Sequence, residues 1–313
     1  MGFVGAMVVA MALDALWGWP GGLFARIGHP VTWLGALINV LDARWNRKAD
    51  MQAVRRAAGI AAAFSVIAFA AGLGWVVQTA FPSGWTRVAL IGIFAWPFVA
   101  LHSLRDHVAA VASALQAGNI VAARIAVAQI VGRDPATLDE AGIARAAIES
   151  LAENTSDGVV APLFWGALLG LPGIVGYKAI NTLDSMIGHR TERHEAFGWA
   201  SARIDDLANL VPARLTALLF VPFAPRWLDA MACVLSDARR HRSINAGWPE
   251  AAMAGALGVR LSGPRLYQGS VADEPWLNET ARDPLAADIV AGLTIYARAM
   301  MLLAGCLVIL AFI

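Results

Sequence analysis

The chain has 313 residues, of which 58% are hydrophobic and 15% are charged, and its mean hydropathy is +0.59. In a soluble globular domain about a quarter of the residues are charged, so this composition favours an integral membrane protein. The net charge of +1, from 24 basic and 23 acidic residues, lacks the basic excess of proteins that bind nucleic acid. We therefore expect membrane lipid around the chain and no nucleic-acid partner.

Long uncharged runs predict where the chain crosses the membrane. Residues 57–86 and 88–104 carry no charged side chain, and a helix needs roughly 20 apolar residues to cross the hydrocarbon core. Pro82 and Gly84 lie between these runs, as expected for the turn of a helical hairpin. The predicted spans are residues 2–17, 57–80, 87–104 and 289–313.

Two further apolar runs contain residues that break a helix. Prolines interrupt residues 158–177, and Pro212 and Arg214 interrupt residues 207–222. Broken helices are tolerated at membrane depth where protein buries them or where they line a cavity. We predict that both runs are short re-entrant or cavity-lining helices.

Basic residues predict the orientation of the chain. They are frequent from Arg44 to Arg56, after the first predicted span, whereas the hairpin turn carries none before Arg87. Because basic loops stay on the cytoplasmic side, we place this loop and the polar middle of the chain in the cytoplasm. The predicted fold is an all-α polytopic membrane protein, a single domain over residues 1–313, with broken or re-entrant helices and cytoplasmic amphipathic helices.

The polar middle of the chain carries helix start signals. Asn119 fits an N-cap residue, whose side chain accepts a hydrogen bond from the first helical turn. Thr137 and Glu140 fit a capping box. The capping box predicts a helix that runs to about Glu153.

Acidic and amide side chains gather at the end of that helix. Glu149 and Glu153 share one face, and Asn154 and Asp157 follow next to an uncharged run. A magnesium ion takes hard oxygen ligands, usually one or two carboxylates together with substrate phosphate. The cluster of Glu153, Asn154 and Asp157 therefore suggests a magnesium site. For Glu149 the simpler interpretation is a solvated face on which Arg145 pairs with it.

A second cluster of polar side chains lies in residues 177–193. If the segment is helical, several of these side chains lie along one narrow stripe of the helix. Polar and ionisable groups beside membrane-depth segments are costly, so they usually line a site or a pathway. Arginines at its end can bind phosphate or carboxylate oxygens in a bidentate manner. The alternative is a helix end whose cations meet lipid headgroups. The stripe, its edge and the side chains after it are Tyr177, Lys178, Asn181, Asp184, Ser185, His189, Arg190 and Arg193.

A third cluster precedes the second broken run. The adjacent carboxylates of Asp205 and Asp206, with Asn209 nearby, again suggest phosphate held through a cation, and Arg214 follows. The alternative is pairing of aspartate with arginine at a helix end. Nearer the start of the chain, His29 follows a glycine-rich turn and titrates near neutral pH, although a lone histidine is more often structural.

Common nucleotide-binding and hydrolase motifs are missing from the sequence. It contains no phosphate loop of the GxxxxGK[ST] type, no GxGxxG, no HExxH and no GxSxG. The chain therefore belongs to none of these motif classes.

Taken together, these segments resemble the CobD/CbiB family. The matching text includes GRDPATLDEAGIARAAIESLAENTSDGVVAPLFWGALLGLPG from Gly132, YKAINTLDSMIGHRTERHEAFGWASARIDDLANLVPARLTALL from Tyr177 and INAGWPEAAMAGALGVRLSGPRLY from Ile244. LDALWGWP and GHPVTWLG stand near the start. The resemblance covers nearly the whole chain in the family's order. It departs from the family's pattern at Asn278, where we expect glycine, and at His189, where tyrosine is frequent.

The resemblance implies an adenosylcobinamide-phosphate synthase in the inner (cytoplasmic) membrane, with its active site facing the cytoplasm. Such an enzyme joins the propionate side chain of adenosylcobyric acid, a corrinoid, to (R)-1-aminopropan-2-ol or its O-phosphate in cobalamin biosynthesis. The reaction is an amide ligation coupled to ATP hydrolysis, and magnesium is the expected metal. A homo-oligomer, or a complex with other enzymes of the corrin pathway, is also expected.

The resemblance and the residue chemistry together assign candidate roles. The ammonium group of the amine must lose a proton before it attacks, which makes a histidine the expected base. The catalytic candidates are His29, His189 and Lys178. The candidates for substrate or phosphate binding are Asn154, Asn181, Ser185, Arg190, Arg193, Asn209 and Arg214. The metal candidates are Glu153, Asp157, Asp184, Asp205 and Asp206.

Two other functions fit parts of the pattern. A membrane-embedded prenyl or phosphoalcohol transferase would also hold diphosphate with aspartates that face a cavity. A non-catalytic membrane protein that handles corrinoids, such as a transporter, is the other alternative. The small number of unbroken spans and the lack of an internal repeat disfavour a transporter.

Overall fold

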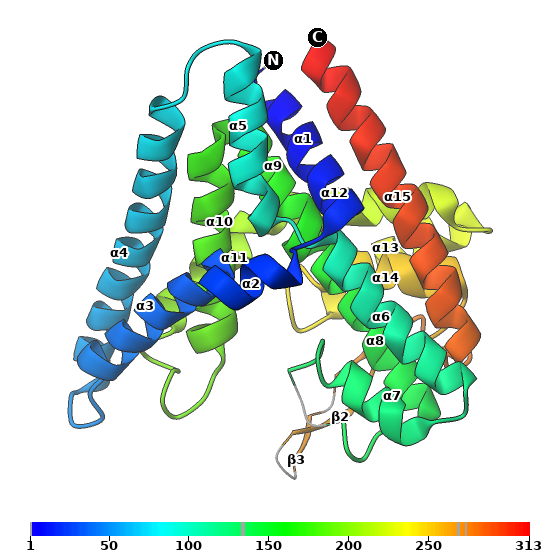
Figure 1. The fold of residues 1–313 in the computed structure, drawn as a ribbon. Helices are drawn as coiled ribbons and strands as arrows, with labels where there is room; N and C mark the ends of the chain where they lie inside the picture. Colours follow the sequence, from blue (N-terminus) through cyan, green and yellow to red (C-terminus); the bar gives the residue numbers. More distant parts are fainter. Residues whose placement is uncertain (1, 133–134, 268–269, 273) are drawn as a thin grey trace. The chain divides into compact units, whose positions relative to one another are not determined.

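The computed structural model describes residues 2–132, 135–267, 270–272 and 274–313, which are predominantly helical (Figure 1). The chain divides into two compact units. Unit one comprises Met1–Ala100, Ala161–Asn209 and Cys306–Ile313, and unit two comprises Leu101–Val160 and Leu210–Gly305. The predicted all-α class is confirmed, while the single domain over the whole chain stays a prediction.

Unit one is built from helices of the first third of the chain and of its middle, together with the last residues of the chain. Its elements are α1 (Gly2–Trp17), α2 (Gly21–Ile27), α3 (Pro30–Trp45), α4 (Gln52–Thr79), α5 (Trp85–Ala95), the 3-10 turn η1 (Trp96–Phe98), α9 (Ala161–Leu169), α10 (Leu171–Leu183), the π-helical turn η3 (Asp184–Gly188) and α11 (Trp199–Ala208).

Helix α4 packs along α10, and small residues on α4 make the close approach possible. Gly59 and Gly74 are buried on α4. A Cβ at Gly59 would overlap the carbonyl oxygen of Phe197, and one at Gly74 would lie 2.9 Å from the carbonyl carbon of Leu171. Small residues at such positions let backbones come close inside a membrane. The segment before α11, which follows the candidate residues His189 and Arg190, is thereby seated against α4.

Unit two contains the polar middle of the chain and most of its last third. Its elements are α6 (Leu101–Gln116), α7 (Ile120–Val127), α8 (Glu140–Thr155), the π-helical turn η2 (Ser156–Val160), α12 (Leu210–Phe220), the 3-10 turn η4 (Val221–Phe223), α13 (Trp227–Asp237), the 3-10 turn η5 (Ala238–Arg240), α14 (Gly247–Leu257), β1 (Leu261–Ser262), β2 (Arg265–Tyr267), β3 (Ser270–Ala272), β4 (Trp276–Leu277) and α15 (Ala286–Phe312), which ends in unit one.

Helix α14 is the centre of unit two. It packs against α12, α13 and α8, and α6 packs against both α7 and α8. Strand β1 pairs with β4 and β2 pairs with β3, both antiparallel. Tyr296 on α15 donates a hydrogen bond of 2.8 Å to the carbonyl oxygen of Leu101, which ties the last helix to the start of α6.

Within the described residues, three helical stretches are long and apolar enough to cross a membrane. They are Gln52–Thr79, Trp85–Gln116 and Ala286–Phe312. These stretches confirm the last three predicted spans as long apolar helices. The first predicted span corresponds to α1, an apolar helix of 16 residues, which is shorter than the other three.

Both runs that were predicted to be broken contain a break, but the second breaks at Asn209 and not at Pro212 or Arg214, which lie inside α12. Gly170, with a φ of 72°, separates α9 from α10, and this conformation is easy only for glycine. The pair Trp199–Ala208 and Leu210–Phe223 is apolar enough to form one broken span. Whether either run is re-entrant or lines a cavity stays a prediction.

The helix start signals were partly right. Asn119 caps α7, since its side chain accepts a hydrogen bond from the Ala122 amide at 3.0 Å. The predicted capping box is wrong. Asp139, one residue before the first turn of α8, is the N-cap and accepts from the Gly142 amide at 2.7 Å. A carboxylate at this position also complements the helix dipole, so Asp139 takes the place expected for Thr137.

Candidate functional site

The second predicted cluster follows the last turns of α10 into η3. Lys178 Nζ lies 3.5 Å from Asn181 Oδ1, and Ser185 Oγ donates to the Asn181 carbonyl oxygen at 2.8 Å. Lys178, Asn181 and Asp184 are partly buried, while Ser185 is exposed. The α-helix becomes π-helical at Asp184, and such π turns are rare and frequent at functional sites. The predicted stripe therefore ends in a locally widened helix.

Asp184 is the candidate carboxylate whose surroundings are best defined. Its Oδ1 occupies the space that a Cβ at position 188 would need, so glycine at 188 allows the carboxylate to lie there. Burial raises the pKa of Asp184, the charge of nearby His189 lowers it, and the carboxylate of Asp206 raises it, leaving the pKa above its ordinary value. Asp206 pairs with Arg203 at 2.8 Å. The charges of two other predicted residues, His189 and Asp206, thus act on Asp184.

His29 caps α3, and both of its ring nitrogens have partners. Nδ1 accepts a hydrogen bond of 3.2 Å from the Val31 amide. The ring also hydrogen-bonds the backbone of Pro97, and since proline offers only a carbonyl oxygen, Nε2 carries the proton. Burial and then the charge of Lys178 lower the pKa of His29, which the bond to Pro97 offsets in part. His29 is therefore a neutral ring near Lys178 with a structural task as a helix cap.

A buried chain of hydrogen bonds connects the second and third clusters. Tyr177 Oη donates to Asn209 Oδ1 at 2.8 Å, and Asn209 Nδ2 donates to Asp205 Oδ2 at 3.0 Å. Tyr177 and Asn209 are almost fully buried. Both the oxygen and the nitrogen of the Asn209 side-chain amide thus have hydrogen-bond partners within the protein. Its place is that of a residue that positions Asp205, and Trp165 reinforces the same region by donating to the Ala208 carbonyl oxygen at 3.1 Å.

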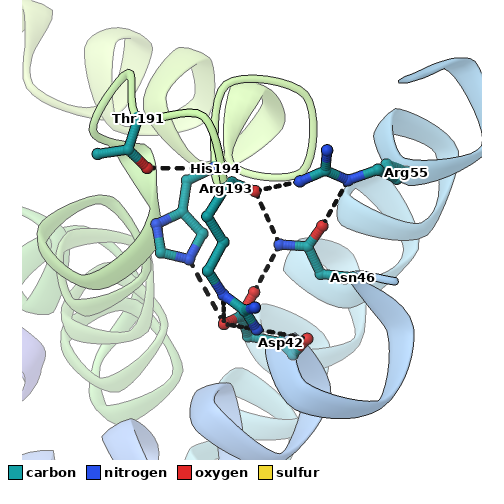
Figure 2. A network of polar contacts seen from close by, with 6 residues as sticks. All are labelled: Asp42, Asn46, Arg55, Thr191, Arg193 and His194. Atoms are coloured by element: carbon teal, nitrogen blue, oxygen red, sulfur yellow. Dashed lines mark hydrogen bonds and ion pairs between the residues drawn. The ribbon is translucent and has the colours of Figure 1, made fainter. Parts of the chain in front are cut away.

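Arg193 lies in an ion-pair network with α3 (Figure 2). Its Nε and Nη2 donate to Asp42 Oδ2 at 2.9 and 2.7 Å, and His194 Nε2 lies 3.4 Å from the same oxygen. Asn46 Nδ2 donates to Asp42 Oδ1 at 2.7 Å and to the Arg193 carbonyl oxygen at 2.9 Å. Arg55 also donates to that carbonyl oxygen. Arg193 therefore holds the segment to α3 and α4.

This network was not foreseen from the sequence. Burial alone would raise the pKa of Asp42, but hydrogen bonds from Asn46, Arg193 and His194 outweigh it and leave the pKa below its ordinary value. The only signal in the sequence was an acidic residue, Asp42, in a strongly basic region. Arg190, by contrast, is exposed and remains available to a charged substrate.

The candidates of the first cluster belong to unit two, at the junction of α8 and η2. Asn154 Nδ2 donates to the Ser150 carbonyl oxygen at 2.9 Å and lies 3.1 Å from Ser150 Oγ. Ser150 Oγ donates to the Ile130 carbonyl oxygen at 2.8 Å. Glu153 is exposed, and Asp157 lies in the π-helical turn η2. As with Asp184, a predicted metal ligand falls in a rare helical geometry.

Two acidic residues of unit two have structural partners. Glu149 is buried, and its Oε1 accepts a hydrogen bond of 2.6 Å from the Ser262 amide. Arg145 pairs with Asp283 and lies 4.6 Å from the ring centre of Trp276. Glu149 thus holds a strand at a residue with positive φ. The simpler interpretation of Glu149 as a solvated residue is wrong.

Arg214 is also in unit two, where it holds the segment before α14. Its Nη1 donates to the Leu210 carbonyl oxygen at 2.8 Å and to Asn245 Oδ1 at 2.9 Å. The guanidinium group lies 4.5 Å from the ring centre of Trp248, a cation–π distance. These contacts give Arg214 a packing role.

The arrangement of carboxylates is suited to magnesium only with help from a substrate. Among the residues that the structure describes, no three His, Cys, Asp or Glu side chains lie close enough together to hold a metal ion by themselves. Asp184 and Asp206 are close enough for their charges to interact. Magnesium commonly takes one or two carboxylates, and water and substrate phosphate fill its remaining positions. Any magnesium ion held here would therefore need substrate or water oxygens as further ligands.

Comparisons with known proteins cover nearly the whole chain. The family model described as "CobD/Cbib protein" matches residues 7–296. A Rhodobacter capsulatus protein named "Cobalamin biosynthesis protein CobD" is 61% identical over 300 residues, which cover 96% of this chain and 95% of the relative. A protein of the same name from Sinorhizobium sp is 44% identical over 315 residues, with 98% of each chain covered. No solved structure matches the chain.

Proposed function

Because this chain belongs to the CobD/Cbib family, we propose that it is an adenosylcobinamide-phosphate synthase of cobalamin biosynthesis. The identity of 61% with a protein named for cobalamin biosynthesis, over 96% of this chain, is the observation that carries the proposal. The long apolar helices support a multi-pass protein. We place it in the inner membrane with its site facing the cytoplasm, where ATP and a soluble corrinoid are available.

The proposed reaction forms one amide bond. A carboxylate does not condense with an amine unaided, so the propionate of adenosylcobyric acid first takes the γ-phosphoryl group of ATP and ADP leaves. The free amine of aminopropanol or its O-phosphate then attacks the acyl carbon, the carbon–nitrogen bond forms, and inorganic phosphate leaves with the carbon–oxygen bond pair. The ammonium proton passes to a base before the attack.

Residues of unit one provide groups for these steps. Lys178 and Arg190 are cationic side chains suited to bind phosphate or propionate oxygens. His189 is exposed and close to Asp184, which makes it a better placed base than His29, whose ring nitrogens both have partners. Asp205 is held in place through Asn209 and Tyr177. Arg193 would act on the site by positioning the segment that contains His189 and Arg190.

Magnesium is proposed as the metal of the reaction. When bound, it would neutralise phosphate charge and so lower the barrier to phosphoryl transfer. Asp184 and Asp206, with Asp205 next to Asp206 in the sequence, are the residues of unit one that would hold it. Burial favours a protonated Asp184, and a bound cation would favour its charged form instead.

The test is a reconstituted reaction. Purified protein, adenosylcobyric acid, ATP and magnesium chloride are incubated with aminopropanol or with its phosphate, and the products are identified by mass. We expect the mass of an amide with at least one amine, only when ATP is present. No amide with either amine would refute the proposal, and activity that needs a prenyl diphosphate instead of ATP would favour a transferase.

A further inference from the structure

A basic surface lies in unit one, where α3 ends and α4 begins. Residues 43–56 include five basic residues and a single acidic one, Asp50. Four of the five basic side chains are exposed, and we call them the loop cations: Arg44, Arg47, Lys48 and Arg56. A concentration of one sign of charge on a small surface attracts ligands of the opposite sign. The surface therefore suits an anionic partner.

The charge of the loop cations is not compensated inside the fold. The fifth basic residue, Arg55, is used there, because it donates to Asn46 Oδ1 at 2.8 Å and to the Arg193 carbonyl oxygen. Within the residues that the structure describes, no hydrogen bond or ion pair engages the side chain of a loop cation. Arg56 Cζ lies 3.7 Å from the ring centre of Trp199. A guanidinium group stacked in this way keeps its N–H groups available to phosphate oxygens.

The loop cations lie at the end of a membrane-spanning helix. Helix α4 is long and apolar enough to cross a membrane, and the uncharged run of residues 57–86 begins directly after Arg56. The charged end of α4 therefore lies where the hydrocarbon core meets the headgroups. Clusters of about four to eight basic residues next to a spanning helix are typical of binding to anionic lipid headgroups.

Exposed apolar side chains among the loop cations favour a lipid over a soluble anion. Trp45, Met51 and Val54 are exposed. Apolar surface gains free energy when it leaves water, and tryptophan is common at membrane–water interfaces. ATP or free phosphate would leave these side chains in water. A phospholipid would cover them with its glycerol and acyl region while its phosphate meets the cations.

We propose that the loop cations bind the headgroup of an anionic membrane phospholipid, and that the bound lipid stabilises the segment that carries His189 and Arg190. Two residues connect the surface to this segment, because Asn46 and Arg55 both donate to the Arg193 carbonyl oxygen (Figure 2). A lipid that orders residues 43–56 therefore also orders the groups that hold Arg193. A zwitterionic lipid brings a cation of its own, which the loop cations repel.

The experiment compares two lipids that have the same acyl chains and differ in headgroup charge. Delipidated protein in detergent at low salt is titrated with dioleoyl phosphatidylglycerol or dioleoyl phosphatidylcholine. Bound lipid is measured by native mass spectrometry, and Tm by tryptophan fluorescence. Each basic residue near an anionic surface strengthens binding about fivefold, so three of them correspond to a preference on the order of 100-fold. We expect wild type to show this preference for phosphatidylglycerol and to gain Tm with it, and we expect R44Q/R47Q/K48Q to lose both effects.

A variant with the same change in net charge is the matched control. R105Q/R226Q/R239Q removes three exposed arginines of unit two and should bind both lipids as wild type does. Equal binding of the two lipids by wild type would overturn the proposal, and so would an equal loss in the control.

A preference that survives in R44Q/R47Q/K48Q would also overturn the proposal. If that variant instead lost binding of ATP with an unchanged lipid preference, the surface would belong to a soluble anion. If it fails to fold, the salt dependence of wild-type binding decides, because salt screens exposed charges. A preference for phosphatidylglycerol that high salt leaves unchanged would then refute the role of the loop cations.

Discussion

Replacing Asp42 by asparagine is predicted to loosen the segment that carries His189 and Arg190 from α3. Arg193 donates two hydrogen bonds to one carboxylate oxygen, at 2.7 and 2.9 Å. The substitution keeps the shape but turns bonds to a charged group, worth about 1.5–3 kcal/mol, into neutral ones of about 0.5–1.5 kcal/mol. The Arg193 side chain is 40% exposed, so water recovers part of the loss. We expect a destabilisation of about 2 kcal/mol.

Thermal unfolding of the purified protein in detergent, followed by tryptophan fluorescence, measures this effect. A loss of about 2 kcal/mol corresponds to a fall in Tm of about 4–8 °C for a large domain. Asp229→Asn is the control, because its ion pair with Arg226 is exposed on both sides and such pairs contribute little. A fall for D42N no larger than that for D229N would refute the reasoning.

The same variant has a predicted pH dependence. The pKa of Asp42 is lower in the folded protein than its ordinary value. Its contribution to stability is therefore fully present above the unfolded pKa of about 3.9 and is lost as the pH falls through the folded value. The difference in Tm between wild type and D42N should be largest near about pH 7 and shrink below about pH 4. A difference that stays constant over this range would contradict the assigned role.

Three further predictions concern other residues. Asp184→Asn should lower the rate of amide formation on the order of 100-fold with an unchanged Tm, as expected for a lost electrostatic contact to the reacting groups; full activity of folded D184N would remove Asp184 from the site. Tyr177→Phe removes the donor that the buried Asn209 side-chain oxygen uses. The free energy of unfolding should therefore fall by about 1–3 kcal/mol, which is measured as a lower Tm. Burial, the charge of Asp237 and the hydrogen bond to it raise the pKa of the Cys233 thiol to about 12. In folded C306A protein at neutral pH, a maleimide should therefore leave Cys233 unmodified, and it should react with Cys233 after denaturation. Rapid labelling of the folded protein would contradict this.

The apolar runs predicted much of the fold, because a helix in lipid must satisfy its backbone internally and needs a minimum apolar length. Prolines also predicted a break in residues 158–177, which the structure has between α9 and α10. The π-helical turns at Ser156 and Asp184 could not be predicted, since each depends on one extra residue per turn and leaves no periodic signal. The cap at Asp139 was missed because Thr137 and Glu140 have the spacing of a capping box, which put the predicted N-cap two residues too early.

The candidate site was only partly predictable, since charge and spacing do not reveal partners distant in the sequence. Arg193 and Arg190 look alike in the sequence, yet Asp42 binds the first, 151 residues away, and leaves the second exposed. Asn278 shows the opposite case. The position where the family pattern led us to expect glycine has a φ of 56°, which asparagine tolerates better than most residues, so this departure preserves the backbone.

Isotope transfer in a single reaction tests the proposed ligation most directly. Adenosylcobyric acid with a heavy oxygen isotope in its propionate carboxylate is incubated with the enzyme, ATP, magnesium and aminopropanol phosphate. If the carboxylate takes the γ-phosphoryl group of ATP, the amide keeps one labelled oxygen and inorganic phosphate receives the other. An amide that forms without transfer of label to phosphate would contradict the acyl-phosphate step, and no amide at all would contradict the assignment as a ligase.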